Sequence, residues 1–561
     1  MHVIEQGPWK SVQTTVDPGD DGPNVLQDAT NCYIPDPTGG SGLYALPGWT
    51  LENGGNAIVT SATAFRGQGA FSHTDLGGNT FNFEVWNGKL IRVNASRTTF
   101  TDVTPTTIDN AVTTRVYGTS FIGQLVVTDG VHRPWVASNL SSTPITATAI
   151  DFDGAATAWA AWGPGVVYTG ALVFILRSVG GVACQTDIAW SVPADPTTGW
   201  QQPNYDFRWT LEQSVNQASL TNLYGLAAEN TQLYYWRENA IGSLSGVPGP
   251  NFQGQATHDA ISKNVGTLSP QSIILFGDNI FFADQTGRPY MLQQGYRILT
   301  PLWLNMREIV DASTYGFPGV TMSVCTAGFE SNLNLYIIAP WSSQPSQNGP
   351  ATQGYIFDAR TGAYSGRMQI GAGMQIDSFG AFVDASGRAV LVAQGSAVVP
   401  SNSQVAPSGF MWTMNSLAGS GSNRTTEGAA LRVTEGGVQR TTEGTTVNWT
   451  DNGVAKVISA TTNRLGYNVN AVLNVDRVSA LVGSTAPCTV SLETASVAQT
   501  VEGTPTPSTV QDGVSKIVVG ASGVQGRGVI VTISPTTSAS QWVLHGLAAT
   551  VVESVAGPEE P

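Results

Sequence analysis

Acidic, histidine and cysteine side chains are the groups of this 561-residue chain that could bind a metal or carry out catalysis. Asp17, Asp20 and Asp21 share one turn and could ligate calcium. They lack the spaced Asp/Asn positions and the distal Glu of an EF-hand loop, which favours a solvated turn. The histidines never have an i, i+4 or HExxH spacing, which indicates surface or satisfied core residues: His2, His73, His132, His258 and His545. We therefore expect neither a metal site nor a cofactor.

The four cysteines are far apart in the sequence and show no CxxC or Cys/His spacing: Cys32, Cys184, Cys325 and Cys488. This pattern indicates neither a zinc site nor a small disulfide framework. We expect four buried thiols, because free cysteine behaves as a small apolar residue.

The sequence also lacks the signatures of a hydrolase. No GxSxG follows an expected strand, and no pair of acidic residues stands out as the two carboxyls of a glycosidase. Turns at 284–287, 358–362 and 384–387 superficially resemble sialidase Asp boxes, but they lack the Ser-x-Asp-x-Gly-x-Thr-Trp arrangement. We interpret them as hairpins in which Gly supplies a positive φ and Asp bonds the turn backbone. We expect no catalytic residue and no enzyme.

The composition is that of a β protein with few charges. Charged residues make up only 12% of the chain, against about a quarter in typical domains, whereas there are 63 Gly and 30 Pro residues. Abundant turn residues favour many short strands. The net charge is −15, from 40 acidic and 25 basic residues, without a basic run. Binding to a phosphate backbone requires such cations, so the charge excludes a reader of DNA but not a conduit through which DNA passes.

A run of apolar, β-branched or aromatic residues that is interrupted by a Gly or Asp turn recurs after roughly fifty residues, and we call this pattern the phrase. Its period is typical of four-stranded propeller blades. The phrase is found at 81–93, 121–136, 166–190, 223–237, 273–292, 333–364 and 379–393. It predicts an all-β fold with a β-propeller of about six to eight blades, at least one of them interrupted.

The phrase divides the chain into four parts. Residues 1–60 are a turn-rich β segment, 61–415 the propeller, with one helix expected at 302–312, and 416–450 a linker in which Thr-Glu-Gly recurs every eight residues. Alternating strands then predict a C-terminal antiparallel β-sandwich over 451–561. No apolar stretch reaches the ~20 residues of a membrane span, and residues 1–13 do not look like a signal peptide, so we expect synthesis in a cytoplasm.

Three stretches resemble the phage tail nozzle or tail-accessory proteins, also called phage stabilisation proteins. The first is an Asn-x-Tyr strand and a Gly-Leu hairpin ending in Pro-Gly: Asn31-Cys32-Tyr33, Gly42-Leu43-Tyr44 and Pro47-Gly48-Trp49. The second resembles a propeller blade leading into a helix: Val265-Gly266, Ser272-Ile273, Gly277, Ile280-Phe281-Phe282, Asp284, Gly287 and Tyr296-Arg297-Ile298. The third resembles the terminal β domain of that group: Arg477-Val478, Gly526-Arg527-Gly528 and residues 542–551.

The resemblance implies a structural virion protein that forms a hexameric ring below the portal and adaptor. Such a ring closes the tail channel, lets DNA pass without specific binding, and gives tail fibres or spikes a docking surface. The Thr-Glu-Gly repeat departs from the familiar members. A second class, a carbohydrate-binding or glycan-hydrolysing propeller, stays open because the chain has 15 tryptophans and the Asp–Gly turns.

Overall fold

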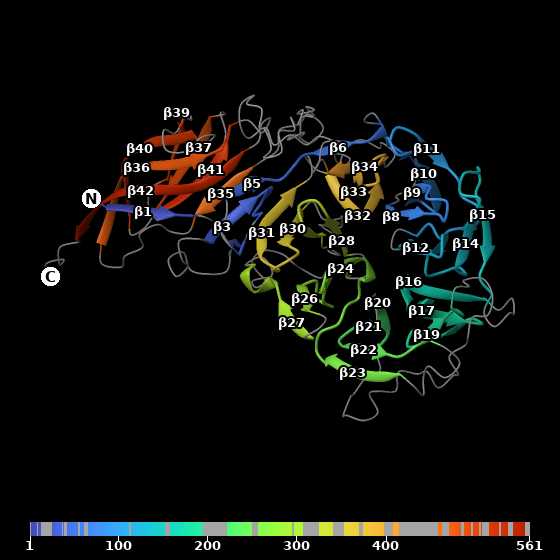
Figure 1. Ribbon diagram of the computed structural model, residues 1–561. Helices are drawn as coiled ribbons and strands as arrows, with labels where there is room; N and C mark the ends of the chain where they lie inside the picture. Colours follow the sequence, from blue (N-terminus) through green and yellow to red (C-terminus); the bar gives the residue numbers. More distant parts are fainter. Residues whose placement is uncertain are drawn as a thin grey trace, which may run out of the picture.

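The structure is a computed structural model (Figure 1). It describes residues 2–7, 9, 11–12, 25–35, 37–38, 42–53, 56–60, 66–111, 114–151, 158–193, 221–229, 231–248, 256–293, 297–306, 325–339, 353–369, 374–397, 408–414, 458–462, 471–483, 487–494, 498–503, 506–507, 515–526, 529–536 and 542–555. The Thr-Glu-Gly repeats and Asp17, Asp20 and Asp21 lie outside these residues.

The described residues confirm the all-β class. They contain many strands, no α-helix, and two single-turn 3-10 helices, η3 (Pro270–Ser272) and η4 (Trp303–Asn305). The helix expected from Leu302 does not form in its first turn, because η4 ends at Met306, whose backbone is extended. Residues 307–312 of that expected helix lie outside the described part of the chain.

Between residues 67 and 414 the described strands form seven consecutive antiparallel groups, arranged in a ring (Figure 1). We call these groups together the ring. Groups one to three are β8 (Gly67–Thr74), β9 (Thr80–Trp86), β10 (Lys89–Val93) and β11 (Phe100–Asp102); β12 (Tyr117–Phe121), β13 (Gln124–Thr128), β14 (Trp135–Ser138) and β15 (Thr146–Ala149); and β16 (Trp159–Tyr168), β17 (Ala171–Val179), β18 (Val182–Ala183) and β19 (Ile188–Trp190).

Groups four to seven continue around the ring. They are β20 (Leu223–Glu229), β21 (Gln232–Arg237), β22 (Ile241–Ser245) and β23 (Thr257–Ser262); β24 (Ile274–Phe276), β25 (Asn279–Ala283), β26 (Pro289–Gln293) and β27 (Ile298–Pro301); β28 (Thr326–Glu330), β29 (Leu335–Ala339), β30 (Gln353–Asp358) and β31 (Tyr364–Gln369); and β32 (Met374–Val383), β33 (Ala389–Ala397) and β34 (Ser408–Met414).

Strands from the N-terminal segment close the ring. β6 (Trp49–Leu51) and β7 (Val59–Thr60) pair antiparallel with β34 and complete the seventh group. On the other side of that group, β32 pairs in parallel with β8, where Gly380 lies opposite Ala70. The first and last groups therefore belong to one nine-stranded sheet.

The apolar runs of the sequence become strands that are buried on both faces. In β13, Leu125 and Val127 pack with Val85 of the first group, whereas Val126 packs with Phe174 of the third group. Side chains alternate between the faces of a strand, so a continuous apolar run suits a sheet enclosed between two others. The turn at Asn87-Gly88 has positive φ at both residues, as a type I′ hairpin requires.

The connection between β23 and β24, residues 263–273, packs against strands of several groups of the ring, and we call it the strap. Its turn, η3, contacts β16, β20, β25 and β28. Thr267, Ser269 and Ser272 are buried, and the Tyr336 hydroxyl donates a 3.1 Å hydrogen bond to the Ser272 carbonyl. The Ser272 hydroxyl in turn accepts a hydrogen bond from the Ala283 amide. The strap thus packs against one strand from each of groups three to six.

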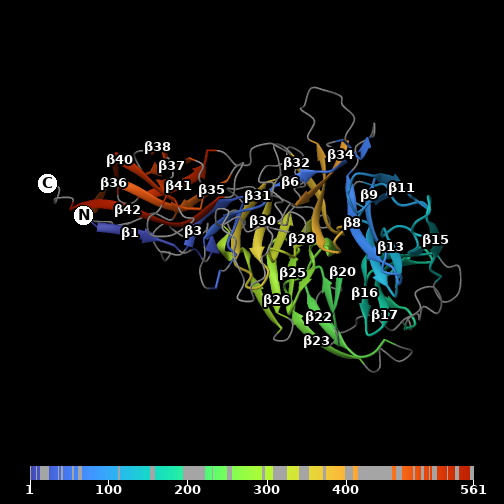
Figure 2. The ribbon, with the colours of Figure 1, turned by 45° about the horizontal axis from the view of Figure 1, so that its top comes forward.

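A second body lies beside the ring, next to β28–β31 (Figures 1 and 2). One of its sheets has the order β39-β40-β36-β42-β5-β4 with β1 on β42. The other continues the sixth group of the ring through a parallel pair between β31 and β3, and has the order β28-β29-β30-β31-β3-β35-β41-β37-β38 with β2 on β3. The strands are β1 (His2–Gln6), β2 (Ser11–Val12), β3 (Val25–Thr30), β4 (Cys32–Tyr33), β5 (Leu43–Ala45), β35 (Ser459–Thr462), β36 (Ala471–Val482), β37 (Cys488–Glu493), β38 (Ala498–Gly503), β39 (Thr506–Pro507), β40 (Ser515–Gly526), β41 (Ile530–Pro535) and β42 (Val543–Val555).

The two sheets of the second body share one core, in which Val478 and Leu547 of the first sheet meet Val490 and Ile533 of the second. The described strands of residues 1–60, which the sequence placed in a segment of their own, are divided between the two bodies: β1 to β5 belong to the second body, and β6 and β7 to the ring. Sequence periodicity misses this because strand pairing between residues about 500 positions apart leaves no local signal.

Candidate functional site

The Asp–Gly turns are hairpin turns, as the sequence predicts. Asp284 and Asp384 each accept backbone hydrogen bonds at Oδ1 from residues two and four positions later, at 2.7–3.0 Å. Gly287 and Gly387 have φ of +89° and +76° and donate back to the carbonyls of these aspartates. Each carboxylate therefore organises its own turn.

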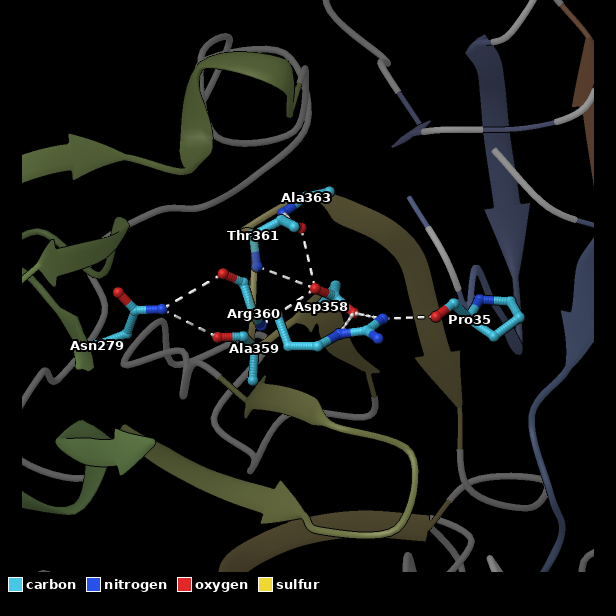
Figure 3. A network of polar contacts seen from close by, with 7 residues as sticks. All are labelled: Pro35, Asn279, Asp358, Ala359, Arg360, Thr361 and Ala363. Atoms are coloured by element: carbon cyan, nitrogen blue, oxygen red, sulfur yellow. Dashed lines mark hydrogen bonds and ion pairs between the residues drawn. The ribbon is translucent and has the colours of Figure 1, made fainter. Parts of the chain in front are cut away.

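The turn at Asp358 has a further role, because it joins three parts of the chain (Figure 3). Asp358 is buried, and its Oδ1 accepts hydrogen bonds from the amides of Arg360 and Thr361 and from the Thr361 hydroxyl. Its Oδ2 accepts hydrogen bonds from Arg360 Nε at 3.1 Å and Nη2 at 2.6 Å. Arg360 Nη2 also donates to the Pro35 carbonyl at 2.5 Å, and Asn279 Nδ2 donates to the carbonyls of Ala359 and Arg360.

Three further contacts bind the same ring group to the N-terminal segment. Arg367 of β31 forms a 2.6 Å ion pair with Asp28 of β3. The Asn31 amide donates to the Arg367 carbonyl at 2.7 Å, and Asn31 Oδ1 accepts a hydrogen bond from the Gln369 amide at 2.8 Å. We call the set Asp28, Asn31, Pro35, Asp358, Arg360 and Arg367 the junction. It connects the ring to strands that enter the second body.

A polar pocket of about 260 Å³ lies elsewhere, between the first three groups of the ring. Asp109, Thr114 and Arg115 come from the connection between β11 and β12, and Asp129 to Val131 from the turn after β13. Trp162 and Gly163 of β16 and Arg177 of β17 complete the wall. A second hollow shares Gly130, Val131 and Arg177 with the pocket and extends to Gln185.

Asp129 cannot serve as a proton donor in this pocket, because both of its carboxylate oxygens already accept hydrogen bonds. Its Oδ1 accepts hydrogen bonds from the amides of Val131 and His132, and its Oδ2 accepts from the Asp109 amide and His132 Nδ1. Burial raises the pKa of Asp129, but these hydrogen bonds outweigh burial and hold the pKa below its usual value. A glycosidase acid needs the opposite shift.

Arg177 lines the pocket and uses one of its nitrogens in a hydrogen bond to a described residue. Its Nη1 donates to the Gly130 carbonyl at 2.6 Å, and its guanidinium lies 5.1 Å from the centre of the Trp162 ring. Tyr224 meets that ring edge-on. Within the described part of the chain, Arg177 has no carboxylate partner. A half-buried cation held in this way attracts an anion.

Histidines and cysteines form no site among the described residues, where no group of three metal-ligating side chains occurs. His73 is a satisfied core residue, bonded to the Ser120 hydroxyl and the Gly123 carbonyl. Burial lowers the pKa of His258 to about 4. Cys32, Cys325 and Cys488 are buried as expected, whereas Cys184 is only partly buried. The side chain of His2 lies outside the described part of the structure.

Neither the junction nor the polar pocket was found from the sequence. The sequence offered one sign of the pocket, because Arg177 is the only charged residue in the apolar strand β17. The pocket's other residues come from three separated stretches, and only folding brings them together. None of the described residues forms a helix long and apolar enough to cross a bilayer.

Comparison with known proteins gives no family for this chain. No family model matches it, and no curated protein matches it. One solved structure that resembles it is described as the extracellular domain of a one component system from B. thetaiotaomicron, with a TM-score of 0.40 and 10% identity over 95% of this chain. The chain spans 62% of the length of that domain.

Another similar structure is an exo-beta-1,3-galactanase from Phanerochaete chrysosporium, determined with galactose. It has a TM-score of 0.21 and 9% identity, and the match covers 88% of this chain and 100% of the galactanase chain. At these scores neither likeness supports an argument about function.

Proposed function

We propose that this chain is a structural protein of a phage tail. In this proposal it is a nozzle or hub without catalytic activity, several copies of which assemble as a ring. That assembly closes the DNA channel below the portal and adaptor and supports fibre docking during DNA ejection. The seven strand groups are then the blades of one propeller, closed by β6 of the N-terminal segment. The protein is made in the host cytoplasm and resides in the virion.

The observation that carries the proposal is the junction. One N-terminal segment contributes strands to both bodies, and an ion pair from Arg367 and a hydrogen bond from Arg360 fasten that segment to the ring. Force applied to one body is transmitted to the other through paired strands. Such a linkage suits a part that carries load or relays a signal from a fibre to a channel.

The strap supports the expectation that the channel lies between copies. Because η3 packs against one strand from each of groups three to six, described residues fill this part of the ring within a single copy. Six copies, as the resemblance implies, would enclose a lumen between them. With a net charge of −15, we expect an acidic or neutral lumen wall that DNA passes without being held, and basic residues at subunit contacts and outside.

The alternative, a glycan-hydrolysing propeller, has less support in the described residues. The pocket holds Asp109 and Asp129, but the hydrogen bonds of Asp129 favour its ionised form and leave it no role as an acid. Glycan binding without hydrolysis remains compatible with a tail protein, because tails meet cell-surface polysaccharides.

Native mass spectrometry of the full chain, alone and mixed with the portal and adaptor of its phage, tests the proposal. We expect a closed symmetric oligomer, alone or on the adaptor. A chain that stays monomeric in both samples and cleaves a glycan would refute the tail assignment and favour the alternative. Detection of the chain in purified virions by peptide mass spectrometry provides an independent check.

A further inference from the structure

The polar pocket combines an open cationic donor with an open acceptor. Arg177 directs one nitrogen to the Gly130 carbonyl, and no described residue accepts from its other nitrogens. In the connection between β11 and β12, which also lines the pocket, Asp109 Oδ2 accepts a hydrogen bond from the Thr114 hydroxyl, while no described residue donates to Asp109 Oδ1. A ligand that satisfies both groups must offer an anionic acceptor to Arg177 and a hydrogen-bond donor to Asp109.

The electrostatics of the pocket restrict that anion. Two acidic residues, Asp109 and Asp129, and two basic residues, Arg115 and Arg177, line the pocket, so their charges balance and leave no excess positive charge to hold a dianion such as hydrogen phosphate. A monoanion that carries hydroxyl groups can direct its charge at Arg177 and a hydroxyl at Asp109. Carboxylate geometry also matches the planar guanidinium fork.

The wall around Arg177 is already ordered for binding. Stacking on Trp162 holds the guanidinium, and the edge contact of Tyr224, with ring centres 5.9 Å apart, holds Trp162. A fixed donor loses little side-chain freedom when a ligand binds. The cavity of about 260 Å³ is smaller than the ~300–1,000 Å³ of sites for drug-sized ligands, so it suits one sugar ring.

We propose that this pocket binds a carboxylated sugar residue, with the carboxylate on Arg177 and a ring hydroxyl on Asp109. The hollow that extends past Arg177 to Gln185 leaves room for the next residue of an acidic polysaccharide. This inference does not depend on the assembly of several copies, because all the residues of the pocket belong to one copy. It gives the chain a way to recognise an acidic glycan.

Isothermal titration calorimetry of the full chain with free glucuronate, galacturonate, N-acetylneuraminate and a uronate trisaccharide tests the proposal, with glucose and inorganic phosphate as comparisons. We expect binding of at least one acidic sugar and none of glucose or phosphate. Tighter binding of the trisaccharide than of the free uronate would identify polysaccharide as the source. Arg177→Gln should weaken binding at least tenfold, since hydrogen bonds to a charged group contribute about 1.5–3 kcal/mol and 1.4 kcal/mol is tenfold.

Arg133→Gln is the matched control, because Arg133 pairs with Asp151 at 2.8 Å and does not line the pocket. It should leave the affinity unchanged. Arg177→Lys, which keeps the charge and loses the fork, should bind with intermediate affinity, and thermal unfolding shows whether each variant is folded. Wild-type protein that binds none of the acidic sugars, or that binds phosphate equally well, would overturn the proposal.

Discussion

Arg360 offers the sharpest test of the junction, because the chain contains a matched arginine that lacks the junction contact. Arg360 and Arg388 both form a two-point ion pair with the aspartate of their own turn, and their side chains are 43% and 31% exposed. Replacing either by Ala removes such a partly exposed pair, worth about 0.2–1 kcal/mol. Only Arg360 also donates to Pro35 of the N-terminal segment.

That extra hydrogen bond sets the expected difference. A hydrogen bond from a charged donor contributes about 1.5–3 kcal/mol when buried, and the exposure of Arg360 reduces this to roughly 1 kcal/mol. Arg360→Ala should therefore cost about 1 kcal/mol more than Arg388→Ala. Because 1 kcal/mol is about a factor of 5 in an opening equilibrium, amide hydrogen exchange at residues 31–34 should speed up about fivefold in Arg360→Ala alone.

Hydrogen-exchange mass spectrometry of both variants and the wild type measures this directly. Peptides that cover Asn31 to Ile34 report the junction, and peptides from β13, far from both arginines in the sequence, report general loosening. If the two variants accelerate exchange at 31–34 equally, or neither does, Arg360 does not fasten the N-terminal segment and the reasoning fails.

Three further outcomes follow from the core and the buried groups. Leu125→Ala should cost about 2–5 kcal/mol in urea unfolding because Leu125 is fully buried in β13, whereas Ile122→Ala, at an exposed turn, should stay within about 0.5 kcal/mol. Burial raises the pKa of Glu84 from 4.5 to about 8 in the folded protein. The contribution of the protonated Glu84 carboxyl to the free energy of unfolding is therefore fully present below pH 4.5 and is lost as the pH rises to about 8. The wild-type free energy of unfolding should therefore fall relative to that of Glu84→Gln across this window, by up to about 1.4 kcal/mol per pH unit, and parallel curves would contradict this. A thiol reagent should modify at most Cys184 in the native protein and all four cysteines after denaturation.

Local sequence signals predicted the hairpins well. Asn87-Gly88 and the Asp–Gly turns carry their geometry in two to five adjacent residues, so their positions could be read directly. The all-β class followed from composition and from apolar runs such as that of β13. These features depend on short-range backbone preferences.

Long-range pairing could not be predicted in the same way. The pairing of β6 with β34 joins residues 49–51 to residues 412–414, and nothing near either strand specifies its partner. The pocket likewise depends on Asp109, Asp129 and Arg177, whose approach results from the packing of three strand groups. The helix expected from Leu302 fails at Met306, where an apolar spacing was mistaken for helical periodicity.

Cryo-electron microscopy of the chain assembled with its portal and adaptor tests the central claim most directly. The account predicts a closed sixfold ring whose lumen lies between copies and is lined by acidic or neutral side chains. A map without a closed ring, or with a continuous band of Lys and Arg along the lumen, would contradict it, because such a band would hold DNA rather than let it pass.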